Sequence, residues 1–357
     1  MAKFGLNTKG TLGIPILPSF SSWLQNQKLD EIWLRVQGGT ISQKEYESDW
    51  QDGHIQAWAD LYAANPTVKL VFVANLNDTA ENSLKLYNRF LAKGCKFEFI
   101  ELGNEQYQSK YRLSKDLPEV TLKTREMSPE KYLALCQEFL PKFNGSTIVV
   151  QLAPNKNKNI DEYYNHWNRT ILNATNQIPE INYSMHVYAN AGFRWELVEE
   201  VQEVIKSKFL AVTEFGAADA ADGEQDNLTE EQFIAMTQVV AERLSEELRE
   251  QDIVFDQVLW NPWGVPSISF EDGDLTAKGR AVFDAFNEPF EEPEIPEVLE
   301  PVLVGVVPDA KGSFVMWGFT WLTFSDGESL RIRTRFGPRP FGSEDIGKTK
   351  AELKNNI

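Results

Sequence analysis

The sequence predicts a closed (β/α)8 barrel followed by a small antiparallel β segment. Short apolar runs rich in β-forming residues alternate eight times with longer stretches of helical periodicity, which is typical of parallel βαβ units. The eight units extend over roughly 290 residues, close to the size of a closed barrel. An open sheet is the alternative, but no glycine-rich phosphate-binding turn follows the first run, which argues against a dinucleotide-binding sheet.

The predicted barrel occupies residues 1–286. Its strands are expected at residues 4–7, 32–37, 70–75, 97–102, 147–152, 182–188, 210–213 and 254–260. Its helices are expected at about residues 21–29, 53–64, 80–93, 129–142, 160–176, 194–207, 228–250 and 275–287. Two helix starts carry local signals. Ser128 is followed by Pro129 at a first helical position, and Thr229 precedes two glutamates that suit the positive end of a helix dipole.

The composition changes after the barrel. Residues 287–301 are rich in glutamate and proline and are expected to form a linker or a strand laid on the barrel. Residues 302–342 contain apolar runs at 302–307, 314–324 and 330–336, separated by turn-forming residues, so a small antiparallel domain is expected there. Residues 343–357 are expected to form a charged tail.

One face of this small sheet is expected to be aromatic. Trp317, Phe319 and Trp321 alternate along the second run and therefore share a face. Three strands are few for an independent module, which favours docking of this face on the barrel or on a protein partner. A sugar-binding platform is the alternative.

The charge balance excludes some classes of partner. The chain has 35 Lys and Arg against 53 Asp and Glu, a net charge of −18, whereas binding to nucleic acid or to an anionic membrane needs clustered basic residues. We therefore expect neither partner. The two cysteines, Cys95 and Cys136, lie in apolar segments outside metal-type spacing, so neither a disulfide nor a metal site is expected.

The N-terminal segment leaves the compartment open. The chain does not begin with a basic segment followed by an apolar stretch, and no run has the length of a membrane span. The sequence is compatible with a cytoplasmic protein, with a component of an assembly such as a virion, with export by another route, and with a chain that has lost its signal peptide.

Two strand ends carry acidic residues in apolar surroundings. The fourth predicted strand leads into ELGNE, with Glu101 and Glu105 at its ends, and the seventh leads into TEFG, which contains Glu214. Carboxylates are rarely buried unless they are paired, and solvent-facing loop acids are the alternative. Catalytic groups of a barrel lie at the carboxyl ends of its strands. We therefore expect Glu105 and Glu214 at the same mouth.

Two carboxyl groups at one barrel mouth suit the cleavage of a glycosidic bond. One protonates the leaving oxygen, and the other attacks the anomeric carbon or activates water. A separation of roughly 5–5.5 Å between the two groups indicates retention of configuration.

The motifs ELGNE and TEFG resemble those of a large clan of retaining (β/α)8 glycoside hydrolases, which includes cellulases, mannanases, β-xylosidases and arabinofuranosidases. The resemblance covers about residues 1–286. It implies that Glu105 is the general acid/base, that Glu214 is the nucleophile and that Asn104 binds the sugar 2-hydroxyl. Gln106 departs from the pattern, since many members carry proline or another residue at this position.

Further positions match the clan. By this resemblance, Arg35 in the second strand hydrogen-bonds the nucleophile, Tyr188 of the HVY motif donates to it, and His186 orients the substrate or tunes the acid. Trp260, at the expected end of the eighth strand, is implied to form an aromatic floor under the sugar. No metal and no other cofactor is implied.

The sequence thus predicts a retaining glycoside hydrolase that cleaves an O-glycosidic bond of a poly- or oligosaccharide by double displacement. The alternative is a catalytically silent carbohydrate-binding or structural component of a larger assembly, such as a virus particle.

Overall fold

The chain forms two compact units, Met1–Pro289 and Phe290–Ile357, which are described separately. The computed structural model describes residues 2–8, 10–27, 29–107, 127–154, 161–188, 195–216, 229–256, 269–287, 303–309, 317–324 and 329–335.

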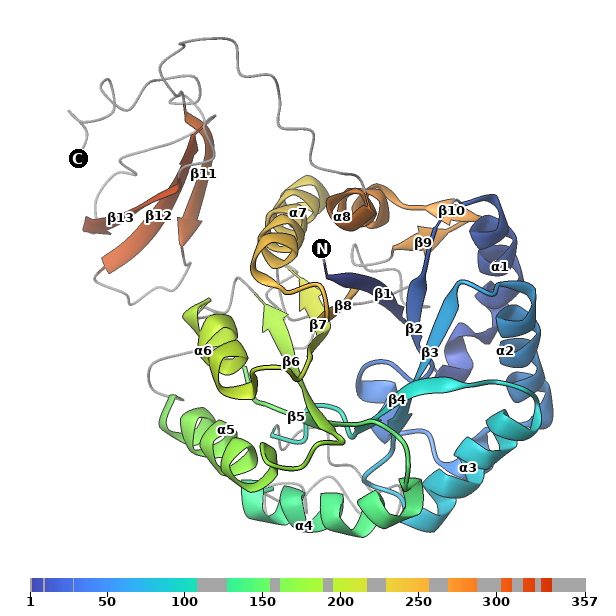
Figure 1. Cartoon of the computed structure of the whole chain (residues 1–357). Helices are drawn as coiled ribbons and strands as arrows, with labels where there is room; N and C mark the ends of the chain where they lie inside the picture. The colour runs from blue at the N-terminus through green and yellow to red at the C-terminus, as the bar shows by residue number, and fades with distance from the viewer. Residues whose placement is uncertain are drawn as a thin grey trace, which may run out of the picture. The chain divides into compact units, whose positions relative to one another are not determined.

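The first unit is a closed barrel of eight parallel strands, as the sequence predicts (Figure 1). In order, the strands are β1 (Lys3–Asn7), β2 (Ile32–Arg35), β3 (Val68–Ala74), β4 (Phe97–Leu102), β5 (Ile148–Gln151), β6 (Ile181–Tyr188), β7 (Leu210–Gly216) and β8 (Ile253–Asp256). The ring closes because β1 pairs in parallel with both β2 and β8.

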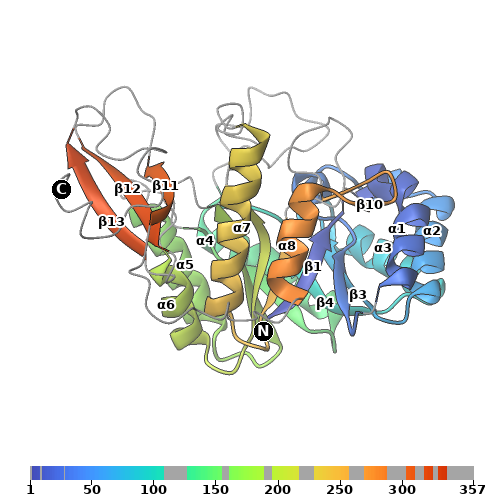
Figure 2. The same cartoon turned by 90° about the horizontal axis from the view of Figure 1, so that it is seen from above.

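Helices surround this ring and run alongside its strands, as the side view shows for α7 and α8 (Figure 2). They are α1 (Leu17–Asn26), α2 (Asp52–Ala64), α3 (Ala80–Ala92), α4 (Pro129–Phe139), α5 (Asp161–Thr175), α6 (Glu196–Ile205), α7 (Glu230–Glu247) and α8 (Ala277–Asn287). Both predicted helix starts are confirmed. The hydroxyls of Ser128 and Thr229 accept hydrogen bonds from the backbone N–H groups of Lys131 and Gln232, which caps α4 and α7.

Several short elements were not predicted from the sequence, because each is too short to show a hydrophobic period. They are the 3-10 segments η1 (Gly10–Ile16), η2 (Thr40–Gln43), η3 (Glu47–Asp49) and η6 (Leu140–Phe143), and a hairpin of β9 (Phe270–Glu271) and β10 (Asp274–Leu275). Among the described helices, none has the length and apolar character that crossing a lipid bilayer requires.

The inside of the barrel has an apolar layer with a polar layer above it. The apolar layer is a buried cluster that includes Trp33, Phe99, Val149 and Ala211. Two residues further along the same four strands stand the buried polar residues Arg35, Glu101, Gln151 and Thr213. Side chains two residues apart on a strand share a face. The polar residues therefore lie on the inner face, one step closer to the carboxyl ends of the strands.

Strand β7 contains one residue more than its neighbours require. Met185 of β6 pairs with Val212, but the next residue, His186, pairs with Glu214, so Thr213 is extra. The pairing with β8 shifts over the same stretch. Such a β-bulge bends a strand and re-aims its side chains. The predicted strand ended at Thr213, whereas the observed strand continues to Gly216 and includes Glu214.

Two other strand ends differ from the expected ones. Strand β2 ends at Arg35 and not at residue 37, because the chain already turns at Val36 and Gln37. A Cβ atom on Gly38 would lie 2.4 Å from Asn7 Oδ1, so glycine permits this close approach. The described part of β8 ends at Asp256, and Trp260 lies outside the described residues.

The end of β8 is tied to α8 by a buried polar cluster. Asp256 accepts hydrogen bonds from Ser269 and from Lys278, and Lys278 Nζ lies 2.9 Å from Ser269 Oγ. All three residues are almost fully buried. Burial lowers the pKa of Lys278, although the charge of Asp256 acts in the opposite direction. The ammonium group therefore depends on its carboxylate partner.

The second unit contains the small antiparallel sheet that the sequence predicts. Its strands are β11 (Leu303–Asp309), β12 (Trp317–Phe324) and β13 (Ser329–Arg335), in the order β11–β12–β13. Strand β12 is therefore central, and β13 is an edge strand.

We predict that Lys278→Met lowers the free energy of unfolding by about 3–5 kcal/mol, because it leaves the Asp256 carboxylate buried without its cation. Lys85→Met is the control, because Lys85 is largely exposed and its ion pair with Glu47 contributes at most about 1 kcal/mol. Urea unfolding followed by circular dichroism measures both variants. Equal losses in the two variants would contradict the assigned role of the buried pair.

Candidate active site

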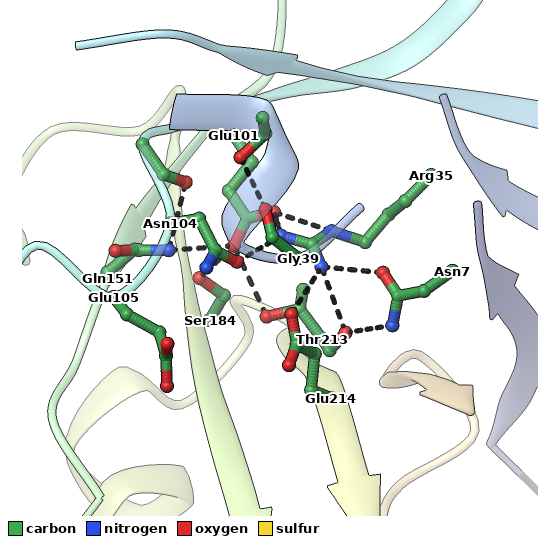
Figure 3. A network of polar contacts seen from close by, with 12 residues as sticks. Asn7, Arg35, Gly39, Glu101, Asn104, Glu105, Gln151, Ser184, Thr213 and Glu214 are labelled. Atoms are coloured by element: carbon green, nitrogen blue, oxygen red, sulfur yellow. Dashed lines mark hydrogen bonds and ion pairs between the residues drawn. The ribbon is translucent and has the colours of Figure 1, made fainter. Parts of the chain in front are cut away.

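The site is organised around the side chain of Arg35, which is fully buried at the end of β2. Its Nε and Nη2 atoms approach Glu101 Oε2 at 2.9 and 2.6 Å. Nη1 donates to Asn7 Oδ1 at 2.6 Å and to the Thr213 carbonyl at 3.1 Å, and Nη2 donates to Asn104 Oδ1 at 3.1 Å. Figure 3 shows this network, in which one guanidinium joins strands β1, β2, β4 and β7.

Glu101 is the carboxylate that makes this buried cation possible. Its Oε1 atom accepts hydrogen bonds from Ser184 Oγ at 2.8 Å, Thr213 Oγ1 at 3.2 Å and Gln151 Nε2 at 3.3 Å. A buried ion pair offsets its desolvation only when the remaining hydrogen-bonding capacity is also satisfied. Here both oxygens of Glu101 are occupied by partners. Its carboxyl group is therefore part of the framework, unlike the solvent-facing loop acid that the sequence left as an alternative.

The turn after β4 holds its residues in an unusual backbone conformation. Gly103 has φ +86° and Glu105 has φ +49°. The left-handed conformation of a non-glycine residue costs of order 1–2 kcal/mol and persists only where the surroundings enforce it. Gln151 holds the turn from both sides, since its Nε2 donates to the Gly103 carbonyl and its Oε1 accepts from the Gln106 N–H.

Gln106 fixes the turn further. Its Nε2 donates to Gln43 Oε1 at 2.9 Å, and Gln43 Oε1 also accepts from the backbone N–H of Leu76. Proline at position 106 would lack the N–H that donates to Gln151. The departure of Gln106 from the resemblance therefore has a local structural reason.

Glu105 and Glu214 both approach the Nδ1 atom of His186. His186 Nδ1 is 3.2 Å from Glu105 Oε1 and 3.8 Å from Glu214 Oε2. These two carboxylate oxygens can therefore be no more than 7.0 Å apart, the sum of 3.2 and 3.8 Å. Tyr188 donates a 2.6 Å hydrogen bond to Glu214 Oε2. All four side chains are buried or nearly so.

The electrostatic environment of His186 combines opposing effects. Burial acts to lower the pKa of the imidazole, but the negative charge of Glu214, the hydrogen bond with Glu105 and the charge of Glu105 outweigh it. The pKa of His186 is therefore raised above its usual value of 6.5. The protonated ring can donate from Nδ1 to Glu105.

Three buried polar atoms of the site have no hydrogen-bond partner among the described residues. They are Asn104 Nδ2, His186 Nε2 and Glu214 Oε1. Glu214 Oε1 is within 3.6 Å of Arg35 Nη1, which is an ion-pair contact longer than a hydrogen bond. Buried polar atoms are normally satisfied, so this set suits a polar ligand with hydroxyl groups.

The structure brings together six of the seven residues that the sequence singled out. They are Arg35, Asn104, Glu105, His186, Tyr188 and Glu214, whereas Trp260 lies outside the described residues. The contact of Arg35 differs from the expected one. Its N–H donors bind Glu101, Asn7, Thr213 and Asn104, so its contact with Glu214 is an ion pair and no hydrogen bond.

Four framework residues were not recognised from the sequence. They are Asn7, Gln151, Ser184 and Thr213. A signal for two of them was present, because Asn7 and Gln151 are polar residues that follow apolar residues at the ends of β1 and β5. In the described part of the chain, no group of three or more His, Cys, Asp and Glu residues is arranged to hold a metal ion.

Comparison with protein-family models finds no match, and comparison with curated proteins finds none either. Similar solved structures include an endo-β-1,3-glucanase from Pseudomonas viridiflava, with 15% identity and a TM-score of 0.48 over 80% of this chain and 98% of that chain. Another is an endo-β-1,3-glucanase from Amycolatopsis mediterranei in complex with laminaripentaose, with 12% identity and a TM-score of 0.42 over 80% and 100%. A third is an oligosaccharide-binding protein from Trichoderma gamsii, with 14% identity and a TM-score of 0.43 over 80% and 93%. At these identities the likeness extends to the fold alone.

We predict that the imidazole of His186 titrates above pH 6.5 and that the Glu105→Gln/Glu214→Gln double variant lowers its pKa below that value, because burial then acts without opposing charges. NMR titration of the ring protons measures this, with His186→Asn to assign the signal. A wild-type midpoint at or below 6.5 would mean that burial outweighs the carboxylates.

The same shift has a consequence for stability. A histidine whose folded-state pKa is raised contributes stability that is complete below its unfolded pKa and is lost as the pH rises through the folded value. The stability difference between wild type and His186→Asn should therefore shrink from pH 6 toward alkaline pH.

Proposed function

We propose that this chain is a retaining glycoside hydrolase that acts on an O-glycosidic bond of a poly- or oligosaccharide. The observation that carries the proposal is the meeting of Glu105 and Glu214 at one imidazole nitrogen in the mouth of the barrel. The upper limit of 7.0 Å between their nearest contacting oxygens accommodates the roughly 5–5.5 Å carboxyl separation of retaining enzymes. The choice of retention over inversion rests on the resemblance of the ELGNE and TEFG motifs to those of retaining enzymes.

Glu214 is the proposed nucleophile. Tyr188 and Arg35 hold its carboxylate, and Oε1 is the oxygen without a hydrogen bond among the described residues. This oxygen attacks the anomeric carbon while the bond to the leaving oxygen breaks, which forms a covalent glycosyl ester.

Glu105 is the proposed general acid/base. It gives its proton to the leaving oxygen in the first step and takes a proton from the attacking water in the second. The second step releases Glu214 as a carboxylate. While Glu214 is esterified its charge is absent, and the strongest influence that raises the pKa of His186 is removed. The imidazole next to Glu105 therefore responds to the covalent state of Glu214.

Asn104 is proposed to hold a substrate hydroxyl group next to the reacting carbon. Its Oδ1 accepts a hydrogen bond from Arg35, which fixes the orientation of the amide. Its Nδ2 has no hydrogen-bond partner among the described residues and is proposed to donate to the substrate hydroxyl. Trp260 remains a proposed aromatic floor, on the resemblance of its position alone. Double displacement by two carboxyl groups requires neither a metal nor an organic cofactor.

We predict that Glu214→Gln lowers kcat on aryl glycosides by at least about 10⁴-fold without loss of the folded structure, because the amide cannot form the glycosyl ester. Glu98→Gln is the matched control, since Glu98 lies on β4 but is exposed. The first measurement is a panel of aryl glycosides and polysaccharides, with NMR of the product anomer. An inverted product would contradict retention, and sugar binding without any turnover by the wild type would favour the silent binding component.

We predict that Glu105→Ala lowers kcat by about 10²–10⁴-fold on substrates with poor leaving groups and much less on those with good ones, because a good leaving group departs without protonation. Azide should restore turnover and yield the glycosyl azide with the configuration of the substrate. An equal loss with all leaving groups and no rescue by azide would assign Glu105 another role.

A further inference from the structure

The strand register of the second unit brings aromatic and arginine residues into one array. On the central strand β12, Trp317, Phe319 and Trp321 occupy alternate positions. Each of them pairs with an arginine of β13. The pairs are Trp317 with Arg335, Phe319 with Arg333 and Trp321 with Arg331. Paired and alternate positions of a sheet share a face, so the three aromatics and the three arginines stand on the same face.

Charge is confined to this face. Among the paired positions of the sheet, the charged residues are these three arginines and Asp309, which pairs with Phe319. The opposite face carries no charged residue at its paired positions, which are Leu303, Val306, Pro308, Gly318, Thr320, Leu322, Phe324, Leu330, Ile332 and Thr334. A three-stranded sheet is stable when one face is covered, and the uncharged face is the one suited to burial.

This segregation changes the expectation for the aromatic residues. Burying their face against an apolar surface would also bury three guanidinium groups, which is costly without carboxylate or phosphate partners. The aromatic face is therefore better suited to a ligand that offers both ring surfaces and anions.

We propose that the face of Trp317, Phe319, Trp321, Arg331, Arg333 and Arg335 binds an acidic polysaccharide, with sugar rings on the aromatic residues and carboxylates or sulfates on the arginines. Guanidinium groups bind carboxylates in a bidentate manner, and aromatic residues offer flat apolar surface with little conformational freedom to lose. Successive positions of the array are about 7 Å apart along each strand, which gives a linear site for an extended polymer.

The choice of a glycan over another polyanion rests on the proposed function of the barrel. The expectation that this face binds an anionic ligand rests on the strand register alone. The net charge of −18 disfavours the densely charged backbone of nucleic acid more than a polysaccharide with sparser charges. Placing charged residues on the edge strand β13 also discourages pairing between sheets of different molecules. That role alone would require no ligand and no aromatic residues opposite the charges.

The test is fluorescence anisotropy of the full chain with a labelled oligogalacturonide and with its methyl ester, which keeps the sugar chain but lacks the charge. We expect binding of the acid and at least tenfold weaker binding of the ester. Arg333→Ala should weaken binding of the acid by about tenfold, the equivalent of one charge-assisted hydrogen bond. Trp321→Ala should weaken binding by about tenfold through the loss of its flat contact with a sugar ring. Thr334→Ala, on the opposite face of β13, is the matched control and should leave binding unchanged.

Several results would overturn the proposal. Equal binding of acid and ester would remove charge recognition. Tighter binding of single-stranded DNA, lost in the same variants, would assign the face to nucleic acid. Aggregation of Arg333→Ala with no binding by the wild type would leave only edge protection. Arg333→Ala and Trp321→Ala should keep the wild-type kcat on aryl glycosides, so failure of the proposed hydrolase activity and failure of this site are separately visible.

Discussion

The buried guanidinium of Arg35 is the interaction on which the site depends. It is held by Glu101, and it in turn holds Asn104, Asn7 and the carbonyl of Thr213. A lone cation inside a barrel would be prohibitively costly, and the pair is tolerable because almost every donor and acceptor is used. Strands that are far apart in the sequence must therefore keep one relative position if the network is to remain satisfied.

Two departures from regular backbone geometry then place the carboxyl groups. The bulge in β7 lets the consecutive residues Thr213 and Glu214 both serve the interior, where a regular strand would point one of them outward. The left-handed conformation of Glu105 places its side chain next to His186 directly after a sharp turn. Both departures lie beside the polar layer, which supplies the hydrogen bonds that hold them. The hydrogen bonds of the polar layer thus offset the strain of these two backbone conformations.

Two features that depend on contacts between residues close in the sequence were predicted correctly, and two that depend on contacts between distant segments were not. Helix starts at Ser128 and Thr229 depend on contacts within one turn and were correctly predicted. Strand β7 was predicted too short, because a glutamate inside an apolar strand looks like a strand end when its partners on other strands are unknown. For the same reason Arg35 was expected to bond the nucleophile, whereas Glu101, 66 positions away, takes its closest contacts.

By itself, the sequence determined the alternation of eight strands with helices, the antiparallel segment at the end, and the residue types at the strand ends. These follow from periodicity and composition, which are local properties, whereas closure of the barrel depends on the pairing of β1 with β8. Only the tertiary structure showed that Glu101 belongs to the buried framework of Arg35, whereas Glu105, four residues later in the same motif, lies next to His186. Burial and partners from β2, β5, β6 and β7 separate their roles. The register of the small sheet likewise decided that its aromatic residues share a face with arginines, because strand pairing is set by contacts between segments and cannot be read from either segment alone.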